Sequence, residues 1–84
     1  MSYKVFILRR AQKELSKLPN KAYNRVKEVI IKLSEKPRPI GAKKLIARDG
    51  WRIKVGKYRV IFEIDDAQQI VTILHVGHRR DVYR

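Results

Sequence analysis

Apolar and polar residues alternate in two runs near the centre of the chain, residues 51–55 and residues 58–64. Alternation with a period of two is typical of a β-strand that buries one face. The pair Gly56-Lys57 separates the runs, and glycine at the first central position of a type II′ turn accepts the positive φ that this turn requires. The pattern therefore predicts a β-hairpin closed by a two-residue turn.

The register of this hairpin collects positive charge on one face. With Gly56 and Lys57 in the turn, Lys54 lies directly opposite Arg59, and Arg52 lies one pleat further along the same face. Like charges in directly opposite positions are unfavourable by less than about 1 kcal/mol per pair. We interpret the arrangement as a site for an anion, most simply a phosphate. The alternative is that all three side chains project into water.

The flanking segments predict two further strands and two helices. Residues 3–8 are β-prone and apolar on both faces, which predicts a strand in the middle of a sheet. Apolar residues spaced by three and four predict helices over residues 9–18 and 21–35, with Asn20 as N-cap of the second helix. Residues 69–76 are apolar on both faces and predict an interior strand.

The segment between the helices and the hairpin, residues 36–49, shows no sustained period and predicts a basic loop anchored by Ile40, Leu45 and Ile46. The order of elements is then β-α-α-β-β-β over a single domain, residues 1–84. Such an order predicts a two-layer α+β fold, with a helical hairpin packed on one face of an antiparallel-rich sheet and the other face open.

The pairing of the hairpin with the last strand decides which late residues join the cationic face. A turn that pairs Ile64 with Ile70 also pairs Arg59 with His75, and a one-residue shift would reverse the assignment of faces. With the first register, one open face collects the side chains of Arg52, Lys54, Arg59, His75 and Arg79.

The amino-acid composition limits the classes of partner that the chain is expected to bind. The 84 residues include 21 Lys and Arg against 8 Asp and Glu, a formal net charge of +13, which favours nucleic acid, an acidic protein or an anionic surface. The absence of cysteine excludes disulfides, a thiolate nucleophile and a cysteine-based zinc site. No apolar run is long enough to span a bilayer, and the N-terminus lacks a signal-peptide layout, so we expect a soluble cytoplasmic protein without membrane contact.

The positions of the acidic and histidine residues argue against two kinds of catalytic site. No carboxylate pair flanks the basic face, and His75 and His78 are three apart on or near a strand, which argues against a shared metal site. Neighbouring positive charge lowers the pKa of a lysine ammonium, so a crowded Lys54 could act as general base toward an RNA 2′-OH. Arginines could stabilise charge on phosphorus, and an arginine or histidine could protonate the departing 5′ oxygen.

Four stretches carry a family resemblance: FILRRAQKELSKLP, KKLIARDGWRIKVG, GKYRVIFEID and VGHRRDVYR. Together they cover nearly the whole chain, and it resembles the RelE/ParE superfamily of bacterial toxins, specifically the RelE branch. The resemblance implies the toxin of a type II toxin-antitoxin system. Its activity would be that of a metal-independent, cofactor-free endoribonuclease that cuts mRNA in the ribosomal A site and so inhibits translation. Attack by the 2′-OH would leave a 2′,3′-cyclic phosphate and a 5′-OH.

The resemblance also implies roles for individual residues. Lys54 becomes the general base beside Arg52, which stands where a lysine is common, and Arg59 becomes the arginine that stabilises the transition state. Leaving-group protonation falls on Arg79, and nucleotide orientation or stacking falls on Tyr83.

Two neighbours of Arg79 stay open as alternatives for the acid role. Arg80 takes it if the alignment is one residue out, and His78 shares it if this chain follows some related toxins. Contacts to RNA or the ribosome are expected from charge alone at Lys43, Lys44, Arg48, Lys57 and Arg80.

The implied partners are a cognate antitoxin that covers the basic face and the ribosome with mRNA in its A site, with operator DNA bound only through the antitoxin complex. An alternative reading is a ParE-like toxin that inhibits DNA gyrase by protein contact without cutting RNA. A third is a degenerate member that only binds its antitoxin and operator DNA.

Overall fold

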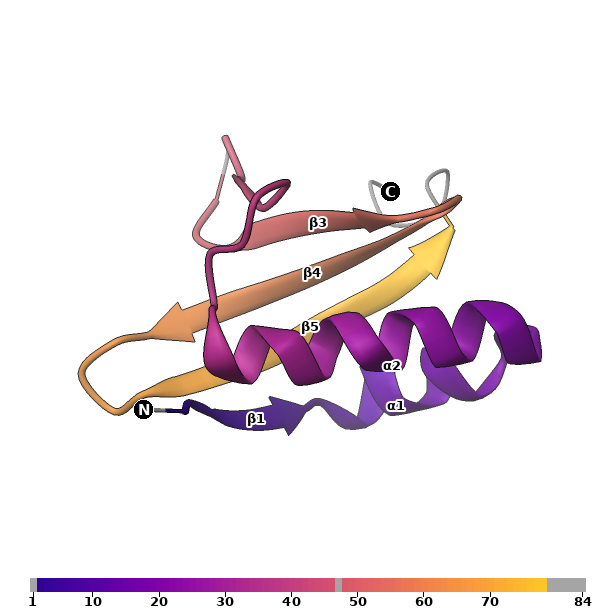
Figure 1. The fold of residues 1–84 in the computed structure, drawn as a ribbon, viewed down its shortest axis with the longest axis horizontal. Coiled ribbons are helices and arrows are strands. Elements are labelled where there is room, and N and C mark those ends of the chain that lie inside the picture. The colour runs from indigo at the N-terminus through magenta and orange to yellow at the C-terminus, as the bar shows by residue number, and fades with distance from the viewer. Residues whose placement is uncertain (1, 47, 79–84) are drawn as a thin grey trace.

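The computed structural model describes residues 2–46 and 48–78, which form two helices packed on a five-stranded sheet (Figure 1). The elements in chain order are β1 (Lys4–Ile7), α1 (Arg9–Ser16), α2 (Asn20–Glu35), β2 (Lys43–Lys44), β3 (Trp51–Val55), β4 (Tyr58–Asp65) and β5 (Ile70–His78). The strands lie in the order β1-β5-β4-β3-β2, with β1 parallel to β5 and every other neighbouring pair antiparallel. The predicted α+β class and the antiparallel-rich sheet are confirmed.

The hydrophobic core lies between the helices and the sheet. Buried side chains of β3, β4 and β5 form one cluster with buried side chains of α1 and α2. The buried cluster consists of Ala11, Leu15, Val26, Ile30, Leu33, Ile53, Val55, Val60, Phe62, Val71, Ile73 and Val76. Residues alternate across a strand, so the polar positions between these core residues point to the other face of the sheet. No helix in the described ranges is long and apolar enough to cross a bilayer.

The first strand does not lie in mid-sheet. β1 is an edge strand paired only with β5, and Phe6 on its second face is 59% exposed. The apolar residues on both faces of residues 3–8 therefore do not reflect burial on both faces. The prediction for residues 69–76 is confirmed, because β5 runs between β1 and β4.

Three local predictions are wrong. Asn20 is the first residue of α2 rather than its cap: Pro19 occupies the N-cap position, without a side-chain capping bond. The loop before β3 contains the two-residue strand β2, too short to show a period. Ile40 and Ile46 are fully exposed, so of the three expected anchors only Leu45 is even partly buried.

A polar network fixes this loop to the rest of the fold. Asp66, in the β4–β5 turn, accepts hydrogen bonds from both terminal nitrogens of Arg38, at 3.2 and 2.7 Å, and from the Tyr3 hydroxyl at 2.7 Å. Arg38 also lies over Trp51, with Cζ 5.3 Å from the ring centroid. The hydrogen bonds from Arg38, and then the one from Tyr3, lower the pKa of Asp66 below its usual value. The network thus joins the N-terminus, the basic loop and the β4–β5 turn.

This network makes part of the stability depend on pH. Since folding lowers the pKa of Asp66, its contribution is complete above the ordinary aspartate pKa of about 3.9 and is lost as the pH falls through the lower folded value. We expect Asp66→Asn to lower the melting temperature at pH 7, and the difference from the wild type to shrink as the protein is acidified below about pH 4. Circular-dichroism melts across this range measure it. Glu63→Gln is the control, and a difference independent of pH would contradict the assignment.

Candidate functional site

The hairpin register predicted from the turn is confirmed. Lys54 pairs with Arg59 and Val55 with Tyr58, and Gly56 opens the turn with φ of +60°. Val55 belongs to the core on the helix side of the sheet. Alternation along the strands therefore directs Arg52, Lys54 and Arg59 to the opposite face.

These side chains line a cleft of about 240 Å³. Its lining, which defines the cationic cleft, consists of Ile40, Gly41, Lys43, Arg52, Ile53, Lys54 and Arg59. It draws on β2, β3, β4 and the loop that precedes β2. Four of the seven residues are cations and none is acidic, so an anion is the ligand that fits its electrostatics.

Burial differs sharply between the paired cations. Arg59 is only 5% exposed, whereas Lys54 is exposed. Arginine rarely lies so deep in a small protein, and its guanidinium carries a delocalised positive charge. In surroundings of low polarity its attraction for an anion is stronger than it would be in water. The cleft thus has a fixed charge at its floor and an accessible lysine beside it.

A tight turn forms one wall of the cleft. The Ala42 N–H donates to the Pro39 carbonyl at 3.0 Å, and Gly41 has φ of +100°. A positive φ at the third residue is the geometry of a type II turn, which favours glycine there. This turn holds the exposed Ile40 at the rim of the cleft.

The two lysines of the short strand β2, which charge alone does not distinguish, point to opposite faces of the sheet. Lys43 pairs with Arg52 and lines the cleft, while Lys44 pairs with Trp51 and does not. Adjacent residues of a strand point to opposite faces, which explains the difference. Of the other positions expected to contact RNA, neither Lys57, in the hairpin turn, nor the exposed Arg48 lines the cleft.

The predicted pairing of β4 with β5 is wrong by two residues. Arg59 pairs with Gly77, and His75 pairs with Ile61. The turn is offset by one residue, since Asp65 rather than Ile64 pairs with Ile70, and an irregularity between Ile61 and Phe62 adds a second shift. Two one-residue shifts restore the original parity, so His75 still belongs to the cationic side of β5, although it is not opposite Arg59.

His78 is not among the residues that the structure brings to the cleft. It pairs with Tyr58, and the two rings meet edge to face with centroids 5.9 Å apart. Strand alternation places this pair on the helix side of the sheet, opposite to Arg59. Arg79, Arg80 and Tyr83 lie outside the described residues. Within residues 2–46 and 48–78, no three His, Asp or Glu side chains are grouped closely enough to hold a metal ion.

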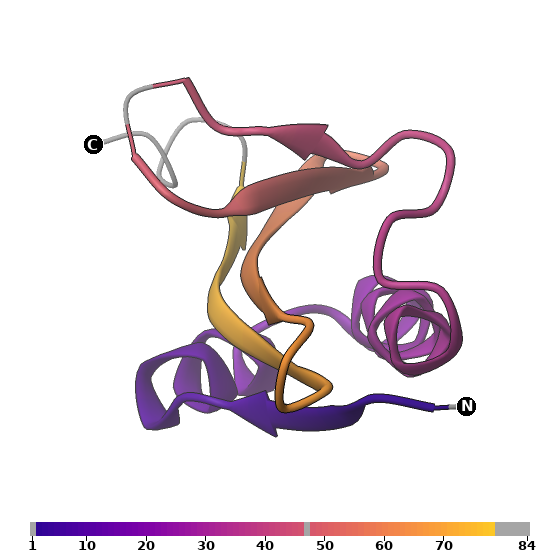
Figure 2. The same cartoon turned by 90° about the vertical axis from the view of Figure 1, so that its left-hand side faces the viewer.

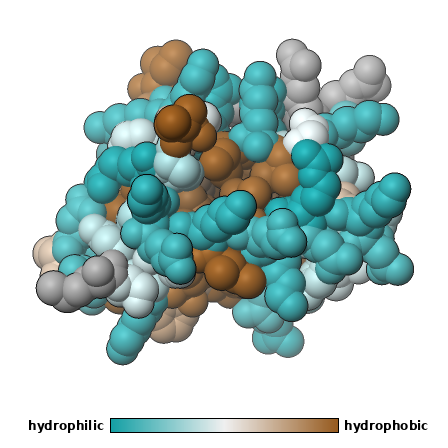
Figure 3. All heavy atoms as spheres, viewed as in Figure 1, coloured by the Kyte–Doolittle hydropathy of each residue, from teal (hydrophilic) through white to brown (hydrophobic). Residues whose placement is uncertain are grey.

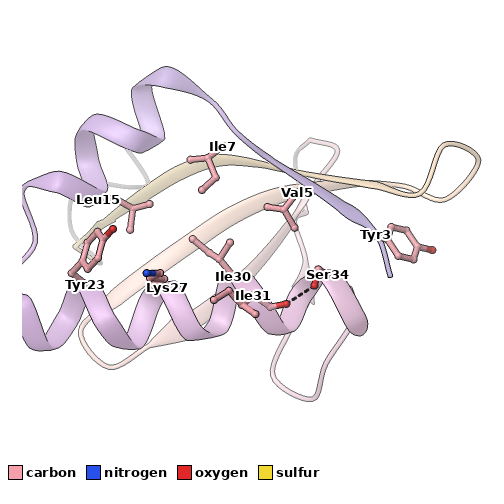
Figure 4. Close-up of a pocket in the computed structure, with 9 residues that line it drawn as sticks. All are labelled: Tyr3, Val5, Ile7, Leu15, Tyr23, Lys27, Ile30, Ile31 and Ser34. Atoms are coloured by element: carbon pink, nitrogen blue, oxygen red, sulfur yellow. Dashed lines mark hydrogen bonds between the residues drawn. The ribbon is translucent and has the colours of Figure 1, made fainter. Parts of the chain in front are cut away.

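A second hollow, the apolar groove, lies between β1 and α2 and has a volume of about 450 Å³. Val5 and Ile7 approach it from β1, Leu15 from α1, and Tyr23 and Ile30 from α2 (Figure 4). The remaining lining residues are Tyr3, Lys27, Ile31 and Ser34. Hydrophobic surface is visible among the hydrophilic side chains in the space-filling view (Figure 3). The helical pattern of α2 does not reveal that Tyr23 and Ile31 stay exposed beside the buried Ile30.

Comparison with known proteins finds matches over nearly the whole chain. The family model for the ParE toxin of the type II toxin-antitoxin system parDE matches residues 5–83. The chain is 35% identical to Toxin RelG of Mycobacterium tuberculosis, with 100% of this chain and 99% of that protein covered.

Two solved structures have the same fold. One is the toxin-antitoxin complex RelBE2 of Mycobacterium tuberculosis, with a TM-score of 0.83 and 32% identity, covering 94% of this chain and 100% of that one. The other is the archaeal RelE-RelB complex of Pyrococcus horikoshii, with a TM-score of 0.81 and 27% identity, covering 98% of this chain and 100% of that one.

The neighbouring lysines of β2 provide a test of the cleft as a phosphodiester site. We expect Lys43→Ala to weaken binding of a single-stranded oligodeoxynucleotide, which lacks the 2′-OH, and to reduce the slope of log affinity against log salt by about 0.7. Lys44→Ala removes the same charge from the other face and should leave the slope nearly unchanged. Fluorescence anisotropy at several salt concentrations measures both. Equal effects of the two variants would argue against the cleft.

Proposed function

The chain belongs to the RelE/ParE superfamily of type II toxin-antitoxin toxins, and from this premise we propose that it is a ribosome-dependent mRNA endoribonuclease. The observation that carries the proposal is the cationic cleft, where the exposed Lys54 lies opposite the buried Arg59 with no acidic residue in the lining. A site of this composition can bind a phosphodiester and stabilise the extra negative charge of its transition state.

The proposed reaction needs no metal or cofactor. Lys54 removes the proton of a 2′-OH, and the 2′ oxygen attacks the adjacent phosphorus. The bond from phosphorus to the 5′ oxygen breaks, which leaves a 2′,3′-cyclic phosphate and, once that oxygen is protonated, a 5′-OH. Arg59 and Arg52 stabilise the charge that develops on the phosphoryl oxygens. The family resemblance assigns the final protonation to Arg79 and nucleotide orientation to Tyr83, both outside the described residues.

The ribosome is the proposed setting of this reaction, and the excess of positive charge supports it. Ribosomal RNA is a dense array of phosphates, and a net charge of +13 favours binding to it through counterion release. Cleavage in the A site would stop translation. Because its substrate would be mRNA on the ribosome, the proposed site of action is the cytoplasm.

The activity test compares three variants on programmed ribosomes. We expect Lys54→Ala and Arg59→Ala each to reduce the rate of mRNA cleavage by about 100-fold or more, because each removes a group that acts in the transition state. Lys32→Ala, an exposed position on α2 outside the lining of the cleft, should cut at close to the wild-type rate. Primer extension locates the cuts, and end analysis should find 2′,3′-cyclic phosphates. Intact mRNA with the wild-type protein would refute the proposal.

Gyrase inhibition is a second candidate, because the matching family model is that of a ParE toxin. A toxin of this kind acts by protein contact and needs no phosphodiester cleft. Accumulation of cleaved DNA in a gyrase assay, with mRNA left intact, would favour it over the nuclease.

We also propose a cognate antitoxin as partner, which reaches operator DNA only as part of the toxin-antitoxin complex. The matching M. tuberculosis and P. horikoshii structures are such complexes. The apolar groove leaves Tyr23 and Ile31, 38% and 55% exposed, available to an amphipathic segment of the antitoxin. Acidic residues on that segment would complement Lys27 in the groove lining and the net positive charge of the chain.

Ile31 allows the groove to be tested. We expect Ile31→Asp to raise the dissociation constant of the antitoxin complex about tenfold or more, since a charge would enter an apolar contact. Ile46→Asp is the matched control, because Ile46 is exposed and lies outside the groove. Calorimetry measures both, and unchanged affinity for Ile31→Asp would remove the groove from the interface.

A further inference from the structure

The outer edge of β5 loses its strand partner before the strand ends. β1 pairs with β5 only as far as Ile7 and Ile73, and the Leu8 N–H donates to the Ile73 carbonyl at 3.0 Å. The chain then enters α1, which packs against β5 (Figure 2). A backbone N–H at a sheet edge needs another hydrogen-bond acceptor once its neighbouring strand has ended.

Glu14 of α1 supplies this acceptor. Its Oε1 accepts a hydrogen bond from the Val76 N–H at 3.0 Å, and its Oε2 lies 3.6 Å from Nδ1 of His75. The carboxylate turns from α1 toward β5, and the side chain is 32% exposed. A bond from a backbone N–H to a carboxylate is charge-assisted and stronger than one to a neutral acceptor.

This bond lies next to the irregularity in the pairing of β4 with β5, which determines the residue that lies opposite Arg59. Phe62 pairs with Ile73 and Ile61 pairs with His75, so Leu74 has no counterpart in β4. An extra residue of this kind bends a strand and reorients the side chains that follow it. Beyond it Val60 pairs with Val76 and Arg59 with Gly77.

We propose that Glu14 is a positioning residue for the cationic cleft: by bonding the Val76 N–H it holds the shifted end of β5 in the register that places Gly77 opposite Arg59. A one-residue slip would turn the Val76 N–H away from α1 and exchange the faces of β5. The carboxylate can therefore hold only one of the two registers. Glycine beside Arg59 adds no side chain to the cleft floor. The consequence for cleavage rests on the proposed nuclease function.

Two substitutions separate the reach of the Glu14 side chain from its charge. Glu14→Gln keeps the length of the side chain and an oxygen that can accept the bond, whereas Glu14→Asp keeps the charge but is one methylene shorter. We expect Glu14→Asp to lose amide-exchange protection at Val76 by about tenfold and to lower kcat for ribosomal mRNA cleavage by about tenfold, with KM little changed. Glu14→Gln should retain most of both, and Glu28→Asp on α2 is the matched control.

The outcomes are distinguishable. Wild-type kcat in a Glu14→Asp variant whose Val76 amide has lost protection would overturn the positioning role and leave the nuclease proposal intact. Equal losses in the Gln and Asp variants would overturn it as well, because Glu14→Gln keeps the reach of the side chain and an accepting oxygen, so loss of the bond would not explain both results. If the wild type cuts no mRNA, the nuclease proposal fails by itself. The backbone amide shifts of Arg59 and Gly77 then decide the positioning role: movement in Glu14→Asp but not in Glu14→Gln supports it, and no movement overturns it.

Discussion

The pairing of β3 with β4 is the constraint on which the rest of the structure depends. A two-residue turn at Gly56 fixes the register, and the period of two then sends every second side chain to the helices and the others to the opposite face. The same pairing that builds the core also forces Lys54 against Arg59. Burial of Val55 and Val60 on the helix side of the sheet therefore places positive charge on the opposite face. The repulsion between these cations is small compared with the free energy gained by burying the core.

An element could be predicted from the sequence when the interactions that determine it join residues close together in the chain. The hairpin was predictable because Gly56 and the alternation around it are local in sequence. The register of β5 was not, because its turn is offset and an extra residue, Leu74, lies within the strand, beside a bond from a helix far away in the chain. The same limit applies to Lys43, whose membership of the cleft depends on a strand of two residues. The edge position of β1 depends on which strands pair, and apolar composition does not specify that.

Polar contacts hold together the parts of the molecule that the core does not reach. Asp66 connects the start of β1 to the basic loop through Tyr3 and Arg38, and Arg38 stacks on Trp51 at the start of β3. At the other end of β5, Glu14 secures the strand beyond β1. With eight acids among 84 residues, carboxylates are scarce, and two of them tie distant elements to the sheet. Acidic residues therefore contribute to shaping this basic protein as much as to balancing its charge.

The order of the strands has a consequence for how the molecule forms. β5 is the last strand of the described chain, yet it lies between β1 and β4, and Lys4 pairs with Ile70. Contacts between residues so far apart are made late, because a long loop must close before they form. During synthesis the β3–β4 hairpin emerges before β5, so Arg59 has a neighbouring strand on one side only until β5 follows. The residues that line the cationic cleft thus emerge before β5, whereas the strand that flanks Arg59 on its second side, and the Glu14 bond that holds that strand, form later.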